Sequence, residues 1–372
     1  VASRRPTSMF ITSGVALVSA YQLCSLHPST TDHQRSPPVV ASVGKCAIKV
    51  LGIGGGGGNA VNRMVESLED ENGAGVEFVC MNTDVQALGN ALTPESLQLG
   101  PECTRGLGAG GKPDVGEAAA HESREAIAGL CAGQDMVFVT AGMGGGTGSG
   151  AAPVVAQIAR EAGALTVGVV STPFSFEGAR RGEQAAAAVE RLRESVDMIV
   201  VVSNDQLLRI IPTGVSLADS FALADEVLRQ GIVGLSDIVT KPGLVNIDFA
   251  DVRSIVADSG LALMGVGRGE GSTRAADAAE AAISSPLLDL PLRRAQRAVF
   301  SVVGGPSMTL QEVNDVATHL SATFDPDANI IFGATVDEAY EDELTVTIVA
   351  TDFIEERFEA DRFSFRPASA TP

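Results

Sequence analysis

The sequence predicts an α/β fold with a mostly parallel sheet, and three observations lead to that prediction. Short apolar runs typical of buried strands recur along residues 47–203. Segments with apolar residues at helical spacing lie between these runs. Glycine-rich stretches follow several of the strand-like runs, and we expect them to form turns because glycine weakens both helices and strands. Alternating strands and helices give a parallel sheet that binds ligands beyond the carboxyl ends of its strands.

The first 45 residues are expected to be a targeting or disordered segment outside the fold. Arg4 and Arg5 precede an uncharged run from Phe10 to Leu26, and a Ser- and Thr-rich stretch poor in acidic residues follows. This order resembles a signal-peptide core with a transit-like tail. An ordinary disordered N-terminus is the alternative. The run contains too much Ser, Thr and Gly to be a transmembrane helix.

The charge of the remaining chain excludes several classes of partner. Four of the 26 Lys and Arg residues and one of the 46 Asp and Glu residues lie in residues 1–45, so residues 46–372 carry 22 basic against 45 acidic residues. Such a body repels polyanions, and we expect no nucleic-acid partner. A nucleotide held by backbone donors and a cation is compatible with this charge. The five cysteines lack Cys-x-x-Cys spacing, which predicts neither a disulfide framework nor a zinc site.

The first predicted unit is a strand at 47–51, a glycine-rich turn at 52–59 and a helix at 60–68. A second strand follows at 76–81. The spacing Gly52-x-Gly54-x-x-Gly57 matches the dinucleotide fingerprint, which is weak evidence by itself. An NAD(P)-dependent dehydrogenase is therefore an alternative, although no substrate-side His or Lys suggests itself. No Gly-Lys-Ser or Gly-Lys-Thr occurs, so phosphates would have to be bound without a Walker A lysine.

The densest glycine run is residues 142–150, between a predicted strand at 136–140 and a predicted helix at 151–159 with Pro153 in its first turn. A turn without Cβ atoms can present backbone N–H groups to an anion at the positive end of a helix. A flexible loop is the alternative. Together with the loops at 55–59 and 106–111, this run could replace the missing lysine, because charge-assisted hydrogen bonds contribute roughly 1.5–3 kcal/mol each.

Further along, strands are predicted at 165–170 and 198–203, with the polar segment 172–181 between them. A long helix is predicted from Ser216, a suitable N-cap, to Thr240, where Lys241-Pro242-Gly243 ends it. The rest of the sequence predicts a smaller α+β domain. Its predicted strands are 262–267, 298–303 and 344–349, and its predicted helices are 274–283 and 310–320.

The run Gly142–Gly150, the order of the other loops and the downstream Asn246-x-Asp248-x-x-Asp251 resemble the tubulin/FtsZ family of division GTPases over roughly residues 47–353. The resemblance implies a Rossmann-like GTP-binding domain (46–215), a central helix (216–240), a smaller α+β GTPase-activating domain (241–355) and a disordered tail (356–372). It also implies GTP or GDP as ligand, with Mg²⁺ bound mainly through phosphates and water.

The same resemblance assigns the nucleotide-binding residues. The phosphate region would comprise Gly55, Gly56, Gly57, Gly58, Asn59, Thr83, Asp84, Gly108, Ala109, Gly110, Gly111, Gly144, Gly145, Gly146, Thr147 and Gly148. The ribose and guanine would lie against Pro173, Glu177, Arg181, Asn204, Phe221 and Asp225. Phe221 would stack on the base, and Asp225 would accept from its N1–H and 2-amino groups, which selects GTP over ATP. Taken without the resemblance, Phe221 would be a core residue, Asp225 a solvated helix face, and Glu177 and Arg181 a solvated ion pair.

The resemblance also assigns catalysis to Asp248 and Asp251 with Asn246, acting on the nucleotide of a neighbouring subunit. The spacing alone favours a helix-capping cluster, and only the resemblance favours catalysis. Head-to-tail filaments of the chain itself would follow, with a paralogue as a further candidate partner. A non-hydrolysing structural filament is the alternative from a third functional class.

The cellular setting is expected to be the division ring in the stroma of a plastid, because of residues 1–45. A mitochondrial matrix or a bacterial-type cytoplasm is the alternative. Residues 354–372 show nothing like the short tail with which many family members bind membrane tethers, which fits either a tail-less paralogue or a truncated sequence. The membrane tether stays unknown, and we expect no membrane insertion of the body.

Overall fold

The structure is a computed structural model that describes residues 46–68, 75–210, 215–241, 243–245, 247–285, 288 and 291–353. The chain divides into residues 1–44 and a compact unit of residues 45–372, and only the second contains described residues. The predicted targeting segment 1–45, the predicted tail 356–372 and Asn246 lie outside the described residues. The domain boundaries proposed within 46–355 stay predictions.

One sheet runs through the compact unit, in the order β3-β2-β1-β4-β5-β6-β7-β10-β8-β9. Its first six strands are all parallel and confirm the predicted α/β fold. They are β1 (Ile48–Ile53), β2 (Val76–Asn82), β3 (Glu95–Gln98), β4 (Met136–Gly142), β5 (Leu165–Thr172) and β6 (Met198–Ser203). This half is built as a doubly wound sheet, in which the strand order reverses between β1 and β4.

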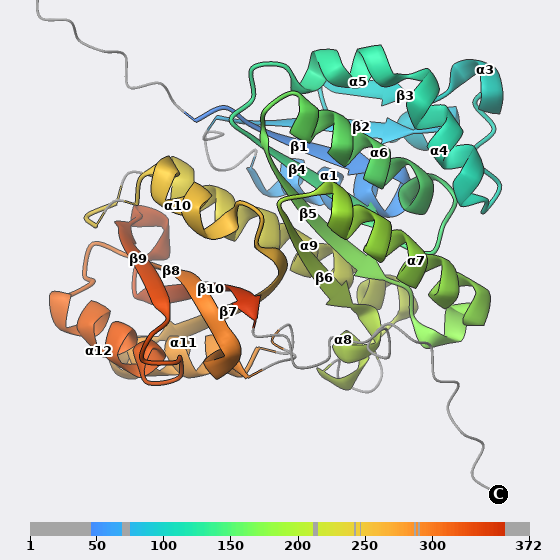
Figure 1. Cartoon of the computed structure of the whole chain (residues 1–372). Coiled ribbons are helices and arrows are strands. Elements are labelled where there is room, and N and C mark those ends of the chain that lie inside the picture. Colours follow the sequence, from blue (N-terminus) through green and yellow to red (C-terminus); the bar gives the residue numbers. More distant parts are fainter. Residues whose placement is uncertain are drawn as a thin grey trace, which may run out of the picture. The chain divides into compact units, whose positions relative to one another are not determined.

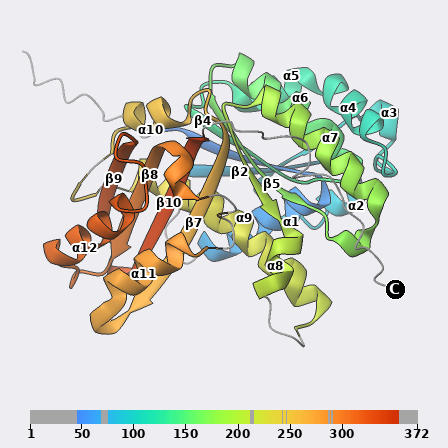
Figure 2. The ribbon, with the colours of Figure 1, turned by 60° about the horizontal axis from the view of Figure 1, so that its bottom comes forward.

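Helices cover both faces of this parallel half (Figures 1 and 2). Helices α1 (Gly54–Leu68) and α9 (Leu217–Thr240) pack against one face. The other face is covered by α4 (Pro113–Glu122), α5 (Arg124–Cys131), α6 (Thr147–Glu161) and α7 (Ala179–Ser195). Strand β1 feeds both cores, because Val50 belongs to the first and Leu51 to the second, as alternation along a strand requires. Short helices α2 (Val85–Leu88), α3 (Pro101–Thr104) and α8 (Asn204–Ile210) complete this half.

The smaller half continues the same sheet. Its strands are β7 (Gly260–Glu270), β8 (Ala295–Gly304), β9 (Asn329–Val336) and β10 (Glu343–Phe353). Strand β10 pairs antiparallel with β7 and β8, while β9 pairs parallel with β8 and forms the edge. Helices α11 (Arg274–Ile283) and α12 (Leu310–Ser321) cover the third core, and α10 (Phe249–Val256) precedes β7. The predicted α+β organisation is confirmed.

The predicted turn at residues 52–59 is wrong, because α1 already begins at Gly54. Close packing explains two of its glycines, Gly52 and Gly57. A Cβ at Gly57 would lie 2.3 Å from the carbonyl oxygen of Thr140 on β4, so no side chain fits there. Contact with the neighbouring strand therefore overrides the poor helix propensity of glycine.

The predicted position of Pro153 is also wrong. Helix α6 begins at Thr147, which puts Pro153 in its interior. Proline has no N–H to donate to the carbonyl four residues earlier, which is that of Ser149. The Arg191 guanidinium donates to this carbonyl instead, at 3.3 Å. A side chain from α7 thus replaces the missing backbone hydrogen bond.

Within the described part of the chain, no helix combines the length and apolar character needed to cross a membrane.

Candidate functional site

The candidate site lies where the strand order reverses. Strands β1 and β4 are neighbours, with Ile53 opposite Ala141 near their carboxyl ends. Helix α1 leaves β1 toward one face of the sheet, and α6 follows β4 on the other. Doubly wound sheets bind their ligands in the crevice at this point, between the two helix N-termini.

The three glycine-rich segments predicted separately meet in this crevice. A Cβ at Gly54 would lie 3.1 Å from the backbone nitrogen of Gly148, which joins the first segment to the third. A Cβ at Gly146 would lie 3.1 Å from the nitrogen of Gly111 and 2.8 Å from the Cβ of Ala109, which joins the third to the second. The absence of side chains lets three backbones approach closely enough to surround one small anionic ligand. We call this arrangement the glycine cradle.

Backbone donors of the cradle come chiefly from helix ends. The first N–H groups of α1 and α6 have no intrahelical acceptor, and the helix dipoles make this end positive. Two predicted donors are already used within the protein: the N–H of Gly108 donates to the Thr83 carbonyl at 3.1 Å, and that of Gly144 to Ser149 Oγ at 2.8 Å. Gly108 and Gly144 therefore shape the cradle, while the helix N-termini supply donors to a ligand.

Three oxygen-bearing side chains lie beside the cradle. The hydroxyl oxygens of Thr83 and Thr147 are 2.7 Å apart, which ties the end of β2 to the start of α6. The carboxylate of Asp84 accepts from the N–H of Gln86 at 2.9 Å and thereby caps α2. Among the described residues no cluster of three or more His, Cys, Asp or Glu side chains could hold a metal ion. A cation here would depend mainly on ligand oxygens and water.

The loop after β5 brings Pro173, Glu177 and Arg181 to the cradle. A Cβ at Gly144 would lie 2.8 Å from the Arg181 carbonyl oxygen and 3.2 Å from Pro173 Cγ. One carboxylate oxygen of Glu177 accepts from the Phe174 N–H at 3.0 Å, and the other pairs with the Arg181 guanidinium. The ion pair expected from the residue pattern is therefore present. Glu177 is largely buried, however, so the pair is held in one position and is not freely solvated.

Asn204 and Phe221 offer groups that the protein leaves free for a ligand. Asn204 is buried at the start of α8, and its Oδ1 has no hydrogen-bond partner. A buried carbonyl oxygen without a donor is costly, and a ligand N–H would relieve that cost. The Phe221 ring is 40% exposed and packs edge-on against Phe174, with ring centroids 5.2 Å apart. Phe221 is thus not the core residue that its sequence context alone suggests, and it can stack on a planar ligand.

Asp225 lies one helical turn after Phe221 on α9, and its environment raises its pKa. Burial, which leaves 17% of the side chain exposed, raises the pKa to about 6, although Arg63 on α1 opposes the shift through its charge and a 3.4 Å contact. Asp225 is therefore not the solvated helix residue that the sequence pattern suggests. A ligand that donates hydrogen bonds to this carboxylate would favour its ionised form.

Arg63 is a site residue that sequence reasoning missed. The sequence could have indicated Arg63 as a site residue, because it lies four residues after Asn59 and hence on the same side of α1 as the end of the glycine run. Its partner Asp225 is 162 positions away, and the sequence gives no indication of that pairing.

The two predicted catalytic acids lie far from the cradle. Asp248 is the N-cap of α10, and its Oδ1 accepts from the Asp251 N–H at 2.7 Å, so the capping interpretation of their spacing is confirmed. Both side chains remain exposed. Helix α10 leads into Gly260 at the start of β7, which pairs with Met198 at the start of β6. The C-terminal end of α10 therefore lies at the amino ends of β6 and β7, whereas the cradle lies at the carboxyl ends of β1 and β4.

The length of helix α9 gives the approximate distance between Asp225 and the acids. Asp225 lies in its first half and the acids follow its C-terminus at Thr240. At 1.5 Å per residue, Asp225 and Thr240 are about 22 Å apart along the helix axis. The acids thus cannot reach a nucleotide bound by Asp225 in the same chain.

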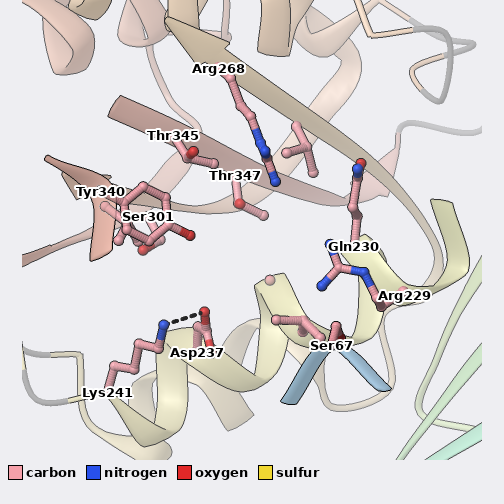
Figure 3. A pocket seen from close by; sticks show the side chains of 14 residues that line it. Ser67, Arg229, Gln230, Asp237, Lys241, Arg268, Ser301, Tyr340, Thr345 and Thr347 are labelled. Atoms are coloured by element: carbon pink, nitrogen blue, oxygen red, sulfur yellow. Dashed lines mark ion pairs between the residues drawn. The ribbon is translucent and has the colours of Figure 1, made fainter. Parts of the chain in front are cut away.

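A second cavity, of about 240 Å³, lies between α9 and the strands of the smaller half (Figure 3). Figure 3 shows Arg268, Thr345 and Thr347 of that half facing Arg229 and Gln230 of α9. The Thr345 hydroxyl is buried without a hydrogen-bond partner. None of the predicted site residues lines this cavity.

Comparison with known proteins gives two family matches. Residues 47–212 match the GTPase domain of the Tubulin/FtsZ family, and residues 260–354 match the C-terminal domain of the FtsZ family. Two solved structures of FtsZ from M. jannaschii are similar over most of both chains. The first, an empty FtsZ dimer, has 41% identity and a TM-score of 0.80, covering 88% of this chain and 95% of the other. The second, a mutant with a Trp-to-Tyr substitution, has 42% identity and a TM-score of 0.79, covering 85% and 94%.

A more distant structure shares the fold. CetZ1 from Haloferax volcanii, described as a GDP-bound monomer, has 20% identity and a TM-score of 0.73, covering 86% of this chain and 97% of the other.

Proposed function

Because the chain belongs to the tubulin/FtsZ family and is a GTPase, we propose that it assembles head to tail into filaments in which each subunit completes its neighbour's hydrolysis site. The tubulin/FtsZ family is involved in filament formation and division, and the proposal starts from that role. The dehydrogenase alternative is wrong, because the segment with the dinucleotide-like spacing lies within the matched GTPase domain. Hydrolysis in trans, the individual site residues and the compartment are the specific parts of the proposal.

The observation that carries the proposal is the separation of the cradle from the acids. The glycine cradle is at the carboxyl ends of β1 and β4, whereas Asp248 and Asp251 follow the C-terminus of α9, which lies about 22 Å along the helix axis from Asp225. Among the described residues, the cradle has neither proposed catalytic acid beside it, and the acids have no phosphate-binding cradle beside them. A second copy stacked along the direction of α9 would bring its acids over the cradle of the first.

In this proposal the cradle binds and orients the nucleotide. The free N–H groups at the starts of α1 and α6 would donate to the phosphates, which explains binding without a Walker A lysine. Asn204 Oδ1 and the Asp225 carboxylate would accept from the guanine, and the exposed Phe221 ring would stack on it. Adenine presents no N1–H to a carboxylate, so Asp225 would make the site selective for guanine.

Mg²⁺, when bound, would offset the phosphate charge, held mainly by phosphate oxygens and water, with Thr83, Thr147 and Asp84 as nearby oxygen groups.

The acids of the next subunit would orient the attacking water. Phosphoryl transfer depends mostly on positioning and charge stabilisation, and a well-placed carboxylate contributes typically about 10²–10⁴-fold. Asp248 has one oxygen engaged as the cap of α10, while Asp251 has no such role and is exposed, so Asp251 is the better placed to contact water. The contact between opposite ends is heterologous, and without closure it gives an open filament. The dimer recorded for the FtsZ of M. jannaschii supports self-association.

The test is Asp251→Ala against a matched control, Asp315→Ala, which removes an exposed acid from α12. We expect Asp251→Ala to bind GTP normally and to lose at least about 100-fold in phosphate release. The wild-type rate per molecule should also rise with protein concentration, because dilute monomers lack complete sites. Normal hydrolysis by Asp251→Ala, or a concentration-independent rate, would refute hydrolysis in trans. A rate lost equally in both variants would show that the effect is not specific to Asp251.

We also propose a plastid as the compartment, with the division ring as the site of assembly. The support is the order of basic, uncharged and hydroxyl-rich segments in residues 1–45. Residues 1–45 fused to a fluorescent protein should enter isolated chloroplasts. Import by mitochondria alone, or no import, would contradict this part of the proposal and leave the GTPase mechanism untouched.

A further inference from the structure

We call residues 241–248, which follow α9 and end at Asp248, the acidic loop. Val245 of this loop pairs with β9, the strand at the edge of the sheet. Val245 donates its N–H to the Ala334 carbonyl at 3.2 Å, and Ala334 donates to the Val245 carbonyl at 3.1 Å. This reciprocal pair is an antiparallel bridge to β9, whose other neighbour is β8. The loop therefore occupies hydrogen-bonding groups that an edge strand would otherwise expose.

An ion pair holds the first end of the acidic loop. The Lys241 ammonium lies 3.0 Å from Asp337, just beyond β9, and 3.2 Å from Asp237 on α9 (Figure 3 shows the Asp237 pair). Burial lowers the pKa of Lys241, but the two carboxylates outweigh burial and raise it above its ordinary value. Lys241 is thus a charged bridge that joins the end of α9 to the smaller half.

A tight apolar contact holds the last described residue before the acids. Ile247 is 5% exposed and directly precedes Asp248. A Cβ at Gly333 on β9 would lie 3.0 Å from Ile247 Cδ1 and 3.2 Å from its Cγ1. The φ of Gly333 is not positive, so its backbone does not require glycine. Glycine weakens a strand and often marks a close approach, and here the space it leaves is filled by Ile247.

We propose that β9 positions the acidic loop for hydrolysis, with Gly333, Lys241 and Asp337 as positioning residues for Asp248 and Asp251. The inference rests on the catalytic role proposed for these acids. Since Asp248 caps α10, the position of Ile247 determines where α10 starts and where both carboxylates point. A displacement of about 1 Å at a catalytic group can cost up to about 100-fold in rate.

A purely structural role for the same contacts predicts a different result. It would lower stability without separating hydrolysis from nucleotide binding. A positioning role lowers the turnover of assembled subunits while GTP affinity stays unchanged, because these contacts lie beyond the C-terminus of α9, away from the residues proposed to bind the nucleotide. The test therefore measures GTP affinity, sedimented polymer and phosphate release per sedimented subunit.

The test is a double-mutant cycle on the contact between Gly333 and Ile247. Gly333→Ala inserts a methyl group against Ile247, and Ile247→Val removes the Cδ1 atom that it would meet. We expect Gly333→Ala to lower phosphate release per sedimented subunit about tenfold with GTP affinity unchanged, and the double variant to recover part of that loss, because the 3.2 Å contact with Cγ1 remains. Gly129→Ala is the control, because an added Cβ there meets no atom within 4 Å.

A second variant adds no volume and so does not depend on repacking. Asp337→Asn removes the charge facing Lys241 but keeps an oxygen that can cap the following turn at Ala339. It should lower turnover several-fold, again at unchanged affinity. Wild-type turnover in both Gly333→Ala and Asp337→Asn would overturn the inference, as would a double variant no faster than Gly333→Ala. If Asp251→Ala hydrolyses GTP normally, the proposed function fails instead; if Asp251→Ala is inactive while these variants are normal, only this inference fails.

Discussion

Replacing Asp225 with asparagine should make the nucleotide-free protein more stable and the nucleotide complex weaker. Burial raises the Asp225 pKa from 3.8 to about 6. Ionising the carboxyl in the folded protein therefore costs about 3 kcal/mol at pH 7.5, a cost that asparagine avoids. Because folding raises the pKa of Asp225, its protonated carboxyl favours the folded state. This contribution to the free energy of unfolding is fully present below pH 3.8 and is lost as the pH rises through about 6.

Urea unfolding of both proteins without nucleotide checks this prediction. The stability advantage of Asp225→Asn should grow by about 1.5 kcal/mol between pH 5 and pH 7.5, up to a maximum of about 3 kcal/mol. Loss of the Arg63 pair reduces this gain only slightly, because Arg63 is 41% exposed. GTP affinity at pH 7.5 should fall by about 100-fold or more, since two charge-assisted hydrogen bonds are lost.

Two results would refute this reasoning. A stability difference that stays constant from pH 5 to pH 7.5 would show that Asp225 is not ionised at a cost in the folded protein. Unchanged GTP affinity in Asp225→Asn would remove Asp225 from the base-binding site. Wild-type affinity for GTP should also be about tenfold weaker at pH 5 than at pH 7.5, because most Asp225 carboxyls are then protonated.

Four further substitutions test the cradle and the smaller half. Gly57→Ala should destabilise the folded protein by about 1–3 kcal/mol, because the added methyl group would meet a backbone carbonyl of β4 at 2.3 Å. Gly55→Ala adds a methyl group that meets no atom within 4 Å, so it should weaken GTP binding without lowering the melting temperature. Glu312→Gln should cost about 2 kcal/mol at pH 7 in chemical unfolding, because a buried arginine lowers the Glu312 pKa to about 2; the wild-type advantage is complete above pH 4.5 and is lost as the pH falls toward 2. Ser149→Ala should cost about 1–3 kcal/mol in the same assay by leaving the buried Gly144 N–H without its acceptor, and a cost near zero would show that water replaces the hydroxyl.

Much of the fold could be predicted because strong apolar periodicity determined it. Five of the six strands of the parallel half and the helix from Ser216 to Thr240 carry buried patterns, and the structure confirms them with shifts of a few residues, whereas the short, exposed β3 was not predicted. Helices α4 and α5 were not predicted. The two helices are short and rich in alanine, with a junction at Ser123, and their burial against α6 cannot be predicted from the local sequence pattern.

The site could be predicted in part for a related reason. The glycine segments were found because no helix or strand favours so many glycines, and the doubly wound order brought them together. The start of α1 was missed because it depends on the contact between Gly57 and β4. The Arg63–Asp225 pair and the anchoring of Ile247 by Gly333 join residues far apart in the chain, so they become visible only in three dimensions.

The separation of the cradle from the acids would give the proposed filament two unlike tips. A row of subunits contains one fewer junction than it has members, and every junction would pair one cradle with one acidic loop. The molecule at one tip would therefore keep its triphosphate with no neighbour to attack it, while the molecule at the other tip would present carboxylates with nothing to act on. Short rows would consume nucleotide more slowly per molecule than long ones, and the intact triphosphate would mark the tip where the next arrival completes a junction.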